Sequence, residues 1–372
     1  MPPISLLIKP ASSLCNLECK YCFYHSIAES RLTKSYGMMS AETLELLVRK
    51  ALDYADDICT FAFQGGEPTL AGLEYFRDFV EYVKKYNVNG IKINYAIQTN
   101  GIIINEEWAR FLSDNNFLAG ISLDGPKDIH DSLRVDPIGK GSFNKVMETI
   151  NLFNKFHVEY NILCVVNSYI ARHANKVYNF FKTNNFKYLQ FIPCLDPLDG
   201  EPGGYQYSLT PERYTHFLKT AFDEWYSDIV KGNAVSIRYF DNLVGMMMGN
   251  PPELCGMVGI CTPYFVVEAD GGVYPCDFYV LDEWRIGNIR ETDFAELKSN
   301  EKTKQFMDTS SYIATSCREC EFYNLCRGGC RRTREPYSDN KPALNYYCSS
   351  YKAFFKYAGR RLQEIAFMFS KR

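Results

Sequence analysis

The chain has 372 residues, enough for two or three domains of roughly 150 residues each, and 46% of them are hydrophobic. Its 41 Lys and Arg against 44 Asp and Glu leave a net charge of −3, which offers no basic field to a phosphate backbone. No apolar run approaches the roughly 18 residues of a membrane span, and residues 1–8 are too short for a signal peptide. We therefore expect a cytoplasmic protein that binds neither nucleic acid nor a membrane.

Six short apolar runs alternate with stretches of helical period from residue 4 to about residue 193. They predict strands over residues 4–9, 59–64, 91–98, 118–124, 159–166 and 188–192. Helices are predicted between them, for example over residues 41–54, with Ser40 as N-cap, and over residues 73–86. This repeat implies parallel strands joined by right-handed crossovers, in an open doubly wound sheet or in a whole or partial barrel. Both place the active site at the carboxyl ends of the strands.

The strand-helix rhythm stops after residue 193. An irregular loop over residues 196–204 and a helix over residues 211–231 follow, and residues 250–348 show short β-like pieces, turns and cysteines. This last stretch has the character of a metal-stapled domain. Apolar residues at helical spacing predict an amphipathic C-terminal helix, docked on the protein rather than lying on a membrane surface. We divide the chain into domains over residues 1–235 and 236–348 and a helix over residues 349–372.

The chain has 14 cysteines, although a reducing compartment disfavours structural disulfides. Three of them, Cys59, Cys164 and Cys194, lie in apolar runs and are expected to be small buried hydrophobes. The clustering of the others favours metal binding. The three groups are Cys15, Cys19 and Cys22; Cys255, Cys261 and Cys276; and Cys317, Cys320, Cys326, Cys330 and Cys348.

The first cysteine group follows the first predicted strand, with the spacing Cys15-x3-Cys19-x2-Cys22. A closed structural zinc site has four protein ligands, and no fourth ligand is near in the sequence. An iron-sulfur cluster held by three thiolates leaves one iron free to bind a small molecule. This spacing, with Tyr21 before Cys22 and Phe23 and Tyr24 after it, resembles the signature of the radical S-adenosylmethionine (SAM) superfamily.

Further residues at the expected strand ends match positions that bind SAM in this superfamily. Two glycines after the second strand let the backbone approach a ligand, and Glu67 accepts hydrogen bonds from an ammonium group. The planar, permanently charged fork of Arg134 suits a carboxylate. Each of these residues has a plain alternative as an ordinary loop or core residue. The resemblance implies Gly66 and Glu67 for the methionyl amino group, Ser122 and Arg134 for the ribose and the methionyl carboxylate, and Tyr21 and Leu195 for the adenine.

The later cysteines resemble the seven-cysteine pattern of the SPASM extension of radical SAM enzymes, and Cys255 supplies an eighth thiolate. Eight thiolates are enough for two [4Fe–4S] clusters. Two four-cysteine zinc sites are the alternative, because the spacing Cys317-x2-Cys320 also suits zinc. The resemblance implies two interleaved ligand sets, Cys255, Cys261, Cys276 and Cys330 for one cluster and Cys317, Cys320, Cys326 and Cys348 for the other.

Six stretches of the chain are similar to the anaerobic sulfatase-maturating enzymes, which oxidise a cysteine or serine of a sulfatase to Cα-formylglycine. The stretches are residues 9–10, 15–17, 21–24, 63–70, 98–101 and 121–126. The resemblance implies a partial (β/α)6 barrel with a C-terminal SPASM domain, three [4Fe–4S] clusters and SAM. It also implies an unfolded sulfatase polypeptide as substrate and an electron donor such as ferredoxin or flavodoxin. Since only 14 residues precede Cys15, we expect the core itself to bind the substrate.

The implied chemistry assigns roles to three more residues. A 5′-deoxyadenosyl radical generated at the first cluster removes a β-hydrogen of the target residue, after which the substrate must lose a proton and a second electron. Asp277 directly follows Cys276 and matches the family's proposed general base; the alternative is an Asp that hydrogen-bonds a cluster turn. Gln64 and Tyr24 are candidates for positioning the peptide.

Two other functions fit the same cysteines. A different SPASM maturase would form a thioether or carbon crosslink in a small peptide, and a non-enzymatic zinc scaffold would contain no sulfide. The sequence does not separate a cysteine target from a serine target.

Overall fold

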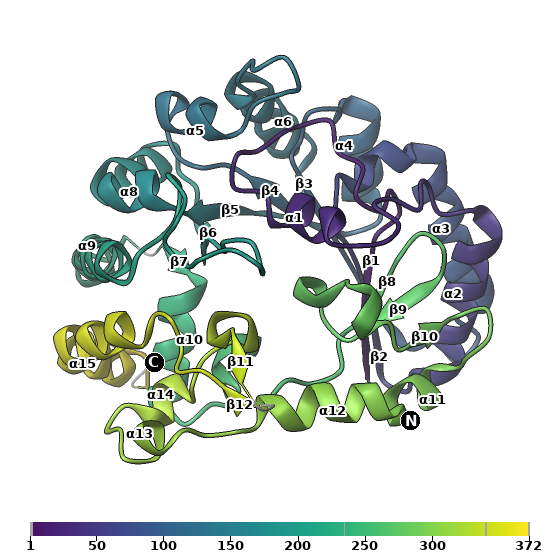
Figure 1. Ribbon diagram of the computed structural model, residues 1–372. Coiled ribbons are helices and arrows are strands. Elements are labelled where there is room, and N and C mark those ends of the chain that lie inside the picture. Colours follow the sequence, from purple (N-terminus) through teal and green to yellow (C-terminus); the bar gives the residue numbers. More distant parts are fainter. Residues whose placement is uncertain (1–2, 234, 339–340, 371–372) are drawn as a thin grey trace. The chain divides into compact units, whose positions relative to one another are not determined.

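The computed structural model describes residues 3–233, 235–338 and 341–370 (Figure 1). Its contacts divide the chain into two compact units. The first unit contains Met1–Ser122, Asp131–Tyr160 and Pro263–Phe306, and the second contains Leu123–His130, Asn161–Thr262 and Met307–Arg372. Both units therefore combine early and late parts of the chain, and the predicted domain boundaries at residues 235 and 348 remain a prediction.

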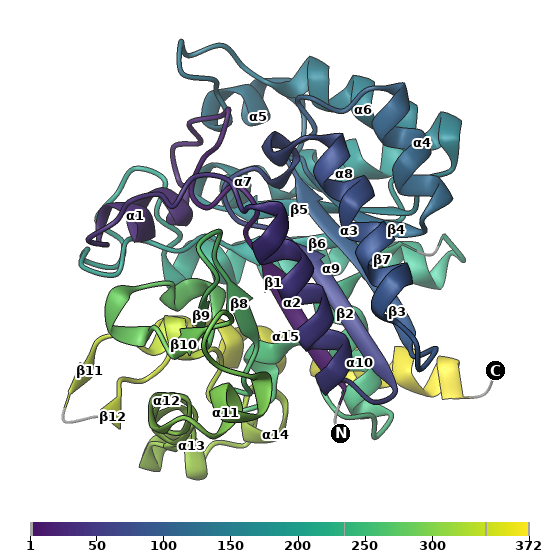
Figure 2. The same cartoon turned by 90° about the vertical axis from the view of Figure 1, so that its right-hand side faces the viewer.

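The first unit is built on a sheet with the strand order β10-β9-β8-β1-β2-β3-β4. Strands β8, β1, β2, β3 and β4 are parallel, whereas β9 is antiparallel to both β8 and β10. Figure 2 shows β1, β2 and β3 running side by side. The strand bounds are β1 Ile4–Ile8, β2 Ile58–Phe63, β3 Lys92–Thr99, β4 Phe117–Ser122, β8 Phe265–Val267, β9 Gly272–Tyr274 and β10 Gly287–Asn288.

Helices of the first unit pack on this sheet through aromatic and aliphatic side chains. In β2, Phe61 and Phe63 face Phe79 of α3 edge to face, with ring centroids 5.2 and 4.8 Å apart. Helix α2 begins where Ser40 accepts a hydrogen bond from the Thr43 amide, as expected for an N-cap. The helices are α1 Phe23–Glu29, α2 Ala41–Tyr54, α3 Leu73–Tyr86, α4 Glu106–Asp114, α6 Phe143–Phe156 and α11 Phe294–Ser299, with 3₁₀ turns η1 Pro68–Ala71, η3 Asp277–Tyr279 and η4 Asp282–Trp284.

The strand register brings residues from distant parts of the sequence to one edge of this sheet. Ile8 at the end of β1 is paired with Phe63 of β2 on one side and with Val267 of β8 on the other. The residues that follow these three strand ends are Lys9, Gln64 and Glu268. Because parallel strands end at a common edge, their side chains start from neighbouring positions.

The second unit contains three parallel strands in the order β5 Tyr160–Val166, β6 Tyr188–Pro193 and β7 Ser236–Ile237, except that Tyr160, the first residue of β5, belongs to the first unit. The C-terminal helix α15, Cys348–Ser370, packs through Phe354 against Phe222 of α9, Pro211–Val230, and Phe240 of α10, Arg238–Met247. This helix is docked on the protein, as the apolar spacing predicts.

The remaining elements of the second unit are α7 Ser168–Arg172, α8 Ala174–Thr183, η2 Cys255–Met257, α13 Thr315–Arg318, α14 Tyr323–Cys326, η5 Arg331–Arg334, β11 Tyr337–Ser338 and β12 Lys341–Pro342, while α5 Lys127–Leu133 and α12 Glu301–Ser310 have residues in both units. Within the described ranges, no helix combines the length and the apolar character needed to cross a bilayer.

The six strands predicted from the sequence correspond to β1 to β6, with ends that differ by at most two residues. The two predicted example helices have the bounds of α2 and α3, and the predicted helix over residues 211–231 is α9. The isolated cysteines Cys59, Cys164 and Cys194 are buried, as expected. The strands β8 to β10 were not predicted individually, because each is only two or three residues long.

Candidate active site

The three cysteines of the first group lie in the loop between β1 and α1. Burial raises the pKa of the Cys15 thiol to about 12, against the opposing amide of Leu17, and the charges of Glu67, Cys19 and Cys22 raise it further. The three sulfurs therefore lie within electrostatic reach of one another. Because metal ligands must be deprotonated, a cationic cluster placed among them would relieve this repulsion. The donor set fits an iron-sulfur cluster held by three thiolates.

Arg134 lies beside this loop. Its Nη1 donates a hydrogen bond to Cys19 Sγ at 3.9 Å, and its guanidinium carbon is 5.4 Å from the ring centroid of Tyr21. Backbone hydrogen bonds from Glu18 N to Val135 O and from Lys20 N to Leu133 O, 2.7 and 3.0 Å long, fix the two segments to each other. The predicted SAM residues Tyr21 and Arg134 are thus brought to the cysteine loop, and their role toward SAM remains a prediction.

The Gly66–Glu67 turn is packed against the cysteine loop. Gly66 has a φ of +56°, and a Cβ there would lie 2.3 Å from the carbonyl oxygen of Leu14, so this position requires glycine. The Glu67 carboxylate accepts hydrogen bonds from Thr69 N, Thr69 Oγ1, Thr99 Oγ1 and Asn100 N. Three of these donors bind Oε1, whereas Asn100 N alone binds Oε2. Because each carboxylate oxygen has two lone pairs, Oε2 can accept a further hydrogen bond, for example from an ammonium group.

Two further residues predicted to bind SAM are found at or just after strand ends. Ser122 ends β4 in the first unit and is buried. Leu195 follows β6 in the second unit, where it lines a cavity of about 290 Å³ together with Asp196, Tyr346 and Tyr347. Tyr347 donates a hydrogen bond to the carbonyl oxygen of Cys194 at 3.0 Å, which fixes the backbone before Leu195.

Asp277, Tyr24 and Gln64 form one hydrogen-bonded group, which we name the acceptor group. Tyr24 Oη donates to Asp277 Oδ2 at 2.6 Å, and Gln64 Nε2 donates to Tyr24 Oη at 2.6 Å and to Asp277 Oδ2 at 3.4 Å. Asp277 is 7% exposed, and its other oxygen, Oδ1, is buried with no hydrogen-bond partner among the described residues. The sequence separates Tyr24 from Asp277 by 253 positions.

Burial dominates the electrostatics of the acceptor group. It raises the pKa of Asp277 to about 6, against the charge of Lys9 and the hydrogen bond from Tyr24, which lower it. Burial and the neighbouring Asp277 charge hold the pKa of Tyr24 well above its usual range, so Tyr24 keeps its proton and acts as the donor. Oδ2 of Asp277 is therefore occupied, and Oδ1 is the oxygen left to accept a proton.

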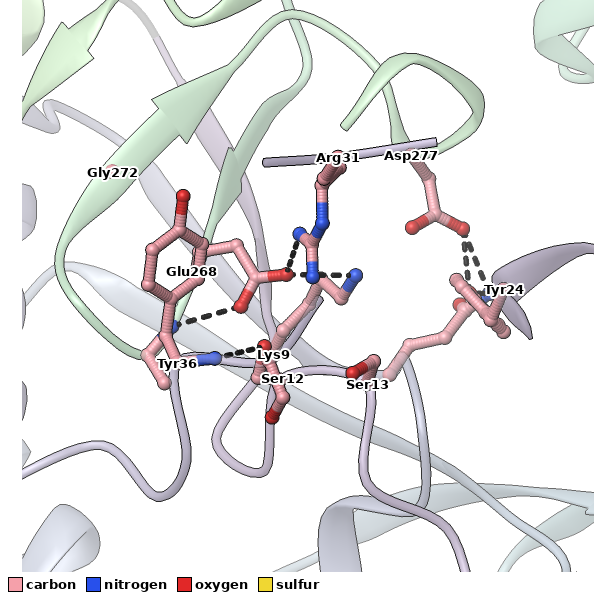
Figure 3. Close-up of polar contacts among 12 residues, drawn as sticks. Lys9, Ser12, Ser13, Tyr24, Arg31, Tyr36, Glu268, Gly272 and Asp277 are labelled. Carbon is pink, nitrogen blue, oxygen red and sulfur yellow. Dashed lines mark hydrogen bonds and ion pairs between the residues drawn. The ribbon is translucent and has the colours of Figure 1, made fainter. Parts of the chain in front are cut away.

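A buried charge cluster of Lys9, Arg31 and Glu268 lies next to the acceptor group. This cluster was not predicted from the sequence. Glu268 Oε1 is 3.0 Å from Lys9 Nζ and 2.6 Å from Arg31 Nη1 (Figure 3). Burial opposes ionisation of Glu268, but the charges of Lys9 and Arg31 outweigh it and lower its pKa to about 2. The sequence does contain a pattern that could have predicted the cluster, namely a charged residue directly after an apolar strand. Lys9 follows Ile4–Ile8 in this way, and Glu268 follows Phe265–Val267.

The cysteines of the second unit fall into two sets. Burial raises the pKa of Cys330 to about 12, and the charges of Cys255 and Cys261 raise it further. Burial raises the pKa of Cys326 to about 11, and there the neighbouring thiols are those of Cys348, Cys317 and Cys320. Cys330 is thus grouped with residues 255 and 261, although it is only four positions from Cys326. Cys276 belongs to the first unit, after β9, and its place in a ligand set remains a prediction.

Comparison with known families and proteins accords with this geometry. The Radical SAM superfamily model matches residues 10–176, and the SPASM iron-sulfur cluster-binding domain model matches residues 259–321. A cysteine-type anaerobic sulfatase-maturating enzyme from Clostridium perfringens is 55% identical over 366 residues, which are 98% of this chain and 99% of the relative. A serine-type enzyme from Bacteroides thetaiotaomicron is 35% identical and covers 95% of this chain and 89% of its own length.

A solved structure of native anSMEcpe with bound AdoMet and Cp18Cys peptide is 54% identical, with a TM-score of 0.95 over 99% of this chain and 100% of that chain. The expected fold class, a partial (β/α)6 barrel of the radical SAM type with a SPASM domain, is confirmed. The cofactors are accordingly SAM and [4Fe–4S] clusters. With this identity over nearly its full length, the chain belongs to the anaerobic sulfatase-maturating enzymes, in the SPASM subgroup of the radical SAM superfamily.

Proposed function

We propose that this enzyme oxidises a cysteine side chain of an unfolded sulfatase segment to Cα-formylglycine, with Asp277 as the base that removes the thiol proton. Loss of a β-hydrogen, this proton and a second electron gives a thioaldehyde, which water hydrolyses to the aldehyde with release of hydrogen sulfide. The preference for cysteine is supported by relatives named as cysteine-type at 52 to 55% identity, against 35% for the serine-type enzyme of Bacteroides thetaiotaomicron. A related structure holds a Cp18Cys peptide, which supports a peptide substrate here.

The proposed cofactor residues are those at the first cysteine loop and the strand ends. Cys15, Cys19 and Cys22 would hold a [4Fe–4S] cluster, which together with SAM supplies the radical that removes a hydrogen from Cβ of the target. Arg134 offers a fork of donors to the methionyl carboxylate, and Gly66 allows the backbone to approach the amino group. Tyr21, Ser122 and Leu195 would complete the site for the adenine and ribose, and Glu67, which also holds the turn that carries Gly66, would accept a hydrogen bond from the amino group.

The observation that carries the assignment of the base is the unpartnered oxygen of Asp277. A buried carboxylate oxygen without a hydrogen bond costs free energy, so its retention indicates a donor that arrives with the substrate. Tyr24 occupies Oδ2 and Gln64 holds Tyr24, which leaves Oδ1 to take the proton from the target sulfur. An Asp that served only to hydrogen-bond a cluster turn would use this oxygen within the protein.

The remaining cysteines are proposed to hold two further clusters. These clusters would supply an acceptor for the second electron released by the substrate. The proposed sets are Cys255, Cys261, Cys276 and Cys330, and Cys317, Cys320, Cys326 and Cys348. Interactions among the thiols of the second unit support this division for seven of these eight cysteines.

The proposed partners follow from the same chemistry. A low-potential carrier such as ferredoxin or flavodoxin would supply the first electron. None of the 14 cysteines, all of them in the described part of the chain, forms a disulfide, which suits a reducing compartment and supports a cytoplasmic location. The net charge of −3 supports the absence of a nucleic acid partner.

The function is tested by anaerobic incubation of the reconstituted enzyme with reductant, SAM and three sulfatase peptides that differ only in Cys, Ser or Ala at the target position. We expect the Cys peptide to yield an aldehyde, seen by mass spectrometry and trapped with a hydrazine, and the Ser peptide to react more slowly. The Ala peptide is the control. A crosslinked product without an aldehyde would assign the enzyme to another class of peptide maturase, and a colourless protein with zinc and no sulfide would contradict radical chemistry altogether.

A further inference from the structure

Lys9 is a buried lysine whose ammonium group is held in one place. The residue is 2% exposed, and Nζ lies 3.0 Å from Glu268 Oε1, which also binds Arg31. Arg31 is itself fixed, because its Nη2 donates to the carbonyl oxygen of Lys34 at 2.7 Å. Holding a long, flexible side chain in one conformation costs entropy, and burying two cations around one carboxylate costs desolvation. These costs suggest that the fixed position of Lys9 serves more than the packing of the sheet.

The backbone of the first unit is shaped to admit this side chain. Gly65 has a φ of +95°, and a Cβ at this position would lie 2.5 Å from Lys9 Cε and 2.8 Å from Lys9 Cγ. Any side chain at residue 65 would therefore displace Lys9. Gly65 directly follows Gln64 of the acceptor group, so the same turn that makes room for Lys9 also carries one of the residues that hold Tyr24.

Lys9 reaches the acceptor group through the ring of Tyr24. Its Nζ is 5.3 Å from the Tyr24 ring centroid, within the range of a cation–π interaction, which is strengthened where both groups are desolvated. Tyr24 Oη then donates to Asp277 Oδ2. One series of contacts thus leads from Glu268 and Arg31 through Lys9 and Tyr24 to Asp277, and Figure 3 shows these five residues in one view.

We propose that Lys9 is a positioning residue for the oxidation: clamped by Glu268 and Arg31, it supports the Tyr24 ring, and Tyr24 in turn holds Asp277 with Oδ1 directed at the target residue. This inference rests on the proposed role of Asp277 as the base. Lys9 itself touches neither the substrate nor SAM in this assignment. Its effect is on geometry, since a base displaced by about 1 Å can lose on the order of 100-fold in rate.

The alternative is that Lys9 only stabilises the fold, and the two roles differ in a measurable ratio. A loss of folded enzyme lowers SAM cleavage and formylglycine formation by the same factor, so the amount of formylglycine per 5′-deoxyadenosine stays constant. A displaced base leaves SAM cleavage in place and lowers this ratio. The coupling ratio therefore reports positioning independently of stability.

The test is a double-mutant cycle on the reconstituted, full-length enzyme with the Cys peptide. Lys9→Met removes the charge at similar volume and should lower the coupling ratio about 10-fold or more, with iron content and SAM cleavage unchanged. Tyr24→Phe keeps the ring and removes the bond to Asp277, and it should also lower the ratio. If Lys9 acts through Tyr24, adding Lys9→Met to Tyr24→Phe should cause little further loss.

Lys50→Met is the matched control, because Lys50 also forms an ion pair with an acid of the 263–306 segment, 2.7 Å from Asp293 Oδ1, outside the acceptor group. It should leave the ratio unchanged. An unchanged ratio in Lys9→Met, or the same loss in both Tyr24 backgrounds, would overturn the inference. If Lys9→Met does not fold, Glu268→Gln carries the same test, since it releases Lys9 at constant shape; an unchanged ratio there would also overturn it.

The coupling ratio of Asp277→Asn shows whether the inference about Lys9 or the assignment of Asp277 as the base has failed. If Asp277→Asn lowers the ratio and Lys9→Met does not, the base stands and only the role of Lys9 is wrong. If Asp277→Asn leaves the ratio unchanged, the base itself is wrongly assigned.

Discussion

Two buried carboxylates of the first unit, Glu67 and Asp277, are held in opposite ways. Glu67 is 1% exposed and accepts hydrogen bonds from four donors of its own chain. Asp277 is bound only at Oδ2, and Oδ1 has no donor among the residues described. A carboxylate held at both oxygens fixes a turn, whereas one held at a single oxygen can still accept a proton at the other. We therefore call the surroundings of Glu67 the proposed SAM-binding end and the surroundings of Asp277 the proposed product-forming end.

The largest effect is expected when all three cysteines of the proposed SAM-binding end are replaced. The variant Cys15→Ala, Cys19→Ala, Cys22→Ala should cleave no SAM, because no cluster forms beside it. Its iron content after anaerobic reconstitution should fall from about 12 to about 8 per chain, since the other eight cysteines hold two four-iron clusters. Iron and sulfide analysis checks this. Loss of all iron would show that the clusters depend on one another, which would contradict the separation of the two ends.

Asp277→Asn should affect only the product-forming end. It keeps the size of the side chain and its bond at Oδ2 but removes the proton acceptor, so formylglycine formation should fall by about 100-fold or more. SAM cleavage to 5′-deoxyadenosine and the iron content should persist, because neither needs this base. The measurement is product by mass spectrometry against 5′-deoxyadenosine by chromatography.

Two results with Asp277→Asn would change the assignment. Normal formylglycine formation would place the base elsewhere. Loss of iron would mean that Asp277 supports the cluster at Cys276 rather than the reaction.

Arg134→Ala should weaken the SAM-binding end without abolishing it. The lost charge-assisted hydrogen bonds to the methionyl carboxylate are worth about 1.5 to 3 kcal/mol, or roughly a 10- to 150-fold rise in the Kd for SAM. Iron content should stay at the wild-type value, which serves as the internal control. An unaltered Kd would contradict a role in SAM binding and would favour a structural role through contacts such as those with Tyr21 and Cys19.

The smallest effect is expected at Asp241, a buried carboxylate outside the active site. It tests whether a buried carboxylate with few hydrogen bonds lowers the free energy of unfolding. Burial raises the pKa of Asp241 to about 6 from an ordinary value of 3.8, with Ser236 Oγ as a donor at 2.6 Å. A raised pKa means that stability is lost as the pH rises from about 4 through about 6, where the folded protein must ionise this group.

Asp241→Asn avoids this loss and should stabilise the protein by about 1.4 kcal/mol more at pH 8 than at pH 5. The urea midpoint at the two pH values measures the difference. An equal gain at both values would show that removal of the charge is not the cause.

Patterns that repeat along the chain predicted the barrel strands and the cysteine groups. The six apolar runs gave β1 to β6 nearly to the residue, because each is a continuous buried strand between helices with clear polar periodicity. The cysteine spacings predict a cluster at the loop of Cys15, Cys19 and Cys22, and the structure brings these three cysteines together. In both cases the signal lies within a few residues of sequence, where local physical rules operate.

Local sequence patterns did not predict the contacts between distant segments. Asp277 was predicted as a base because it follows Cys276, but its unpartnered Oδ1 depends on Tyr24 and Gln64, which bind only Oδ2. The cluster of Lys9, Arg31 and Glu268 was not predicted, because no sequence motif links its three members. The pairing of β8 with β1 brings Glu268 to Lys9, and Arg31 binds the same carboxylate. Glu67 was expected to serve a ligand, and only the register of β2 and β3 shows how many donors of its own chain already reach it.

The pairing of β8 with β1 also bears on how freely the cysteine-rich segment can be exchanged. Leu6–Ile8 of β1 are paired along one side with Phe265–Val267, and β9 and β10 continue the same sheet. A chain cut before residue 263 would leave that side of β1 as a bare strand edge, which invites pairing with other chains. The segment that delivers Asp277 is thus part of the barrel's own sheet. Recombination between relatives should therefore succeed when the crossover lies after β10, and it should give aggregating protein when the crossover separates β1 from β8.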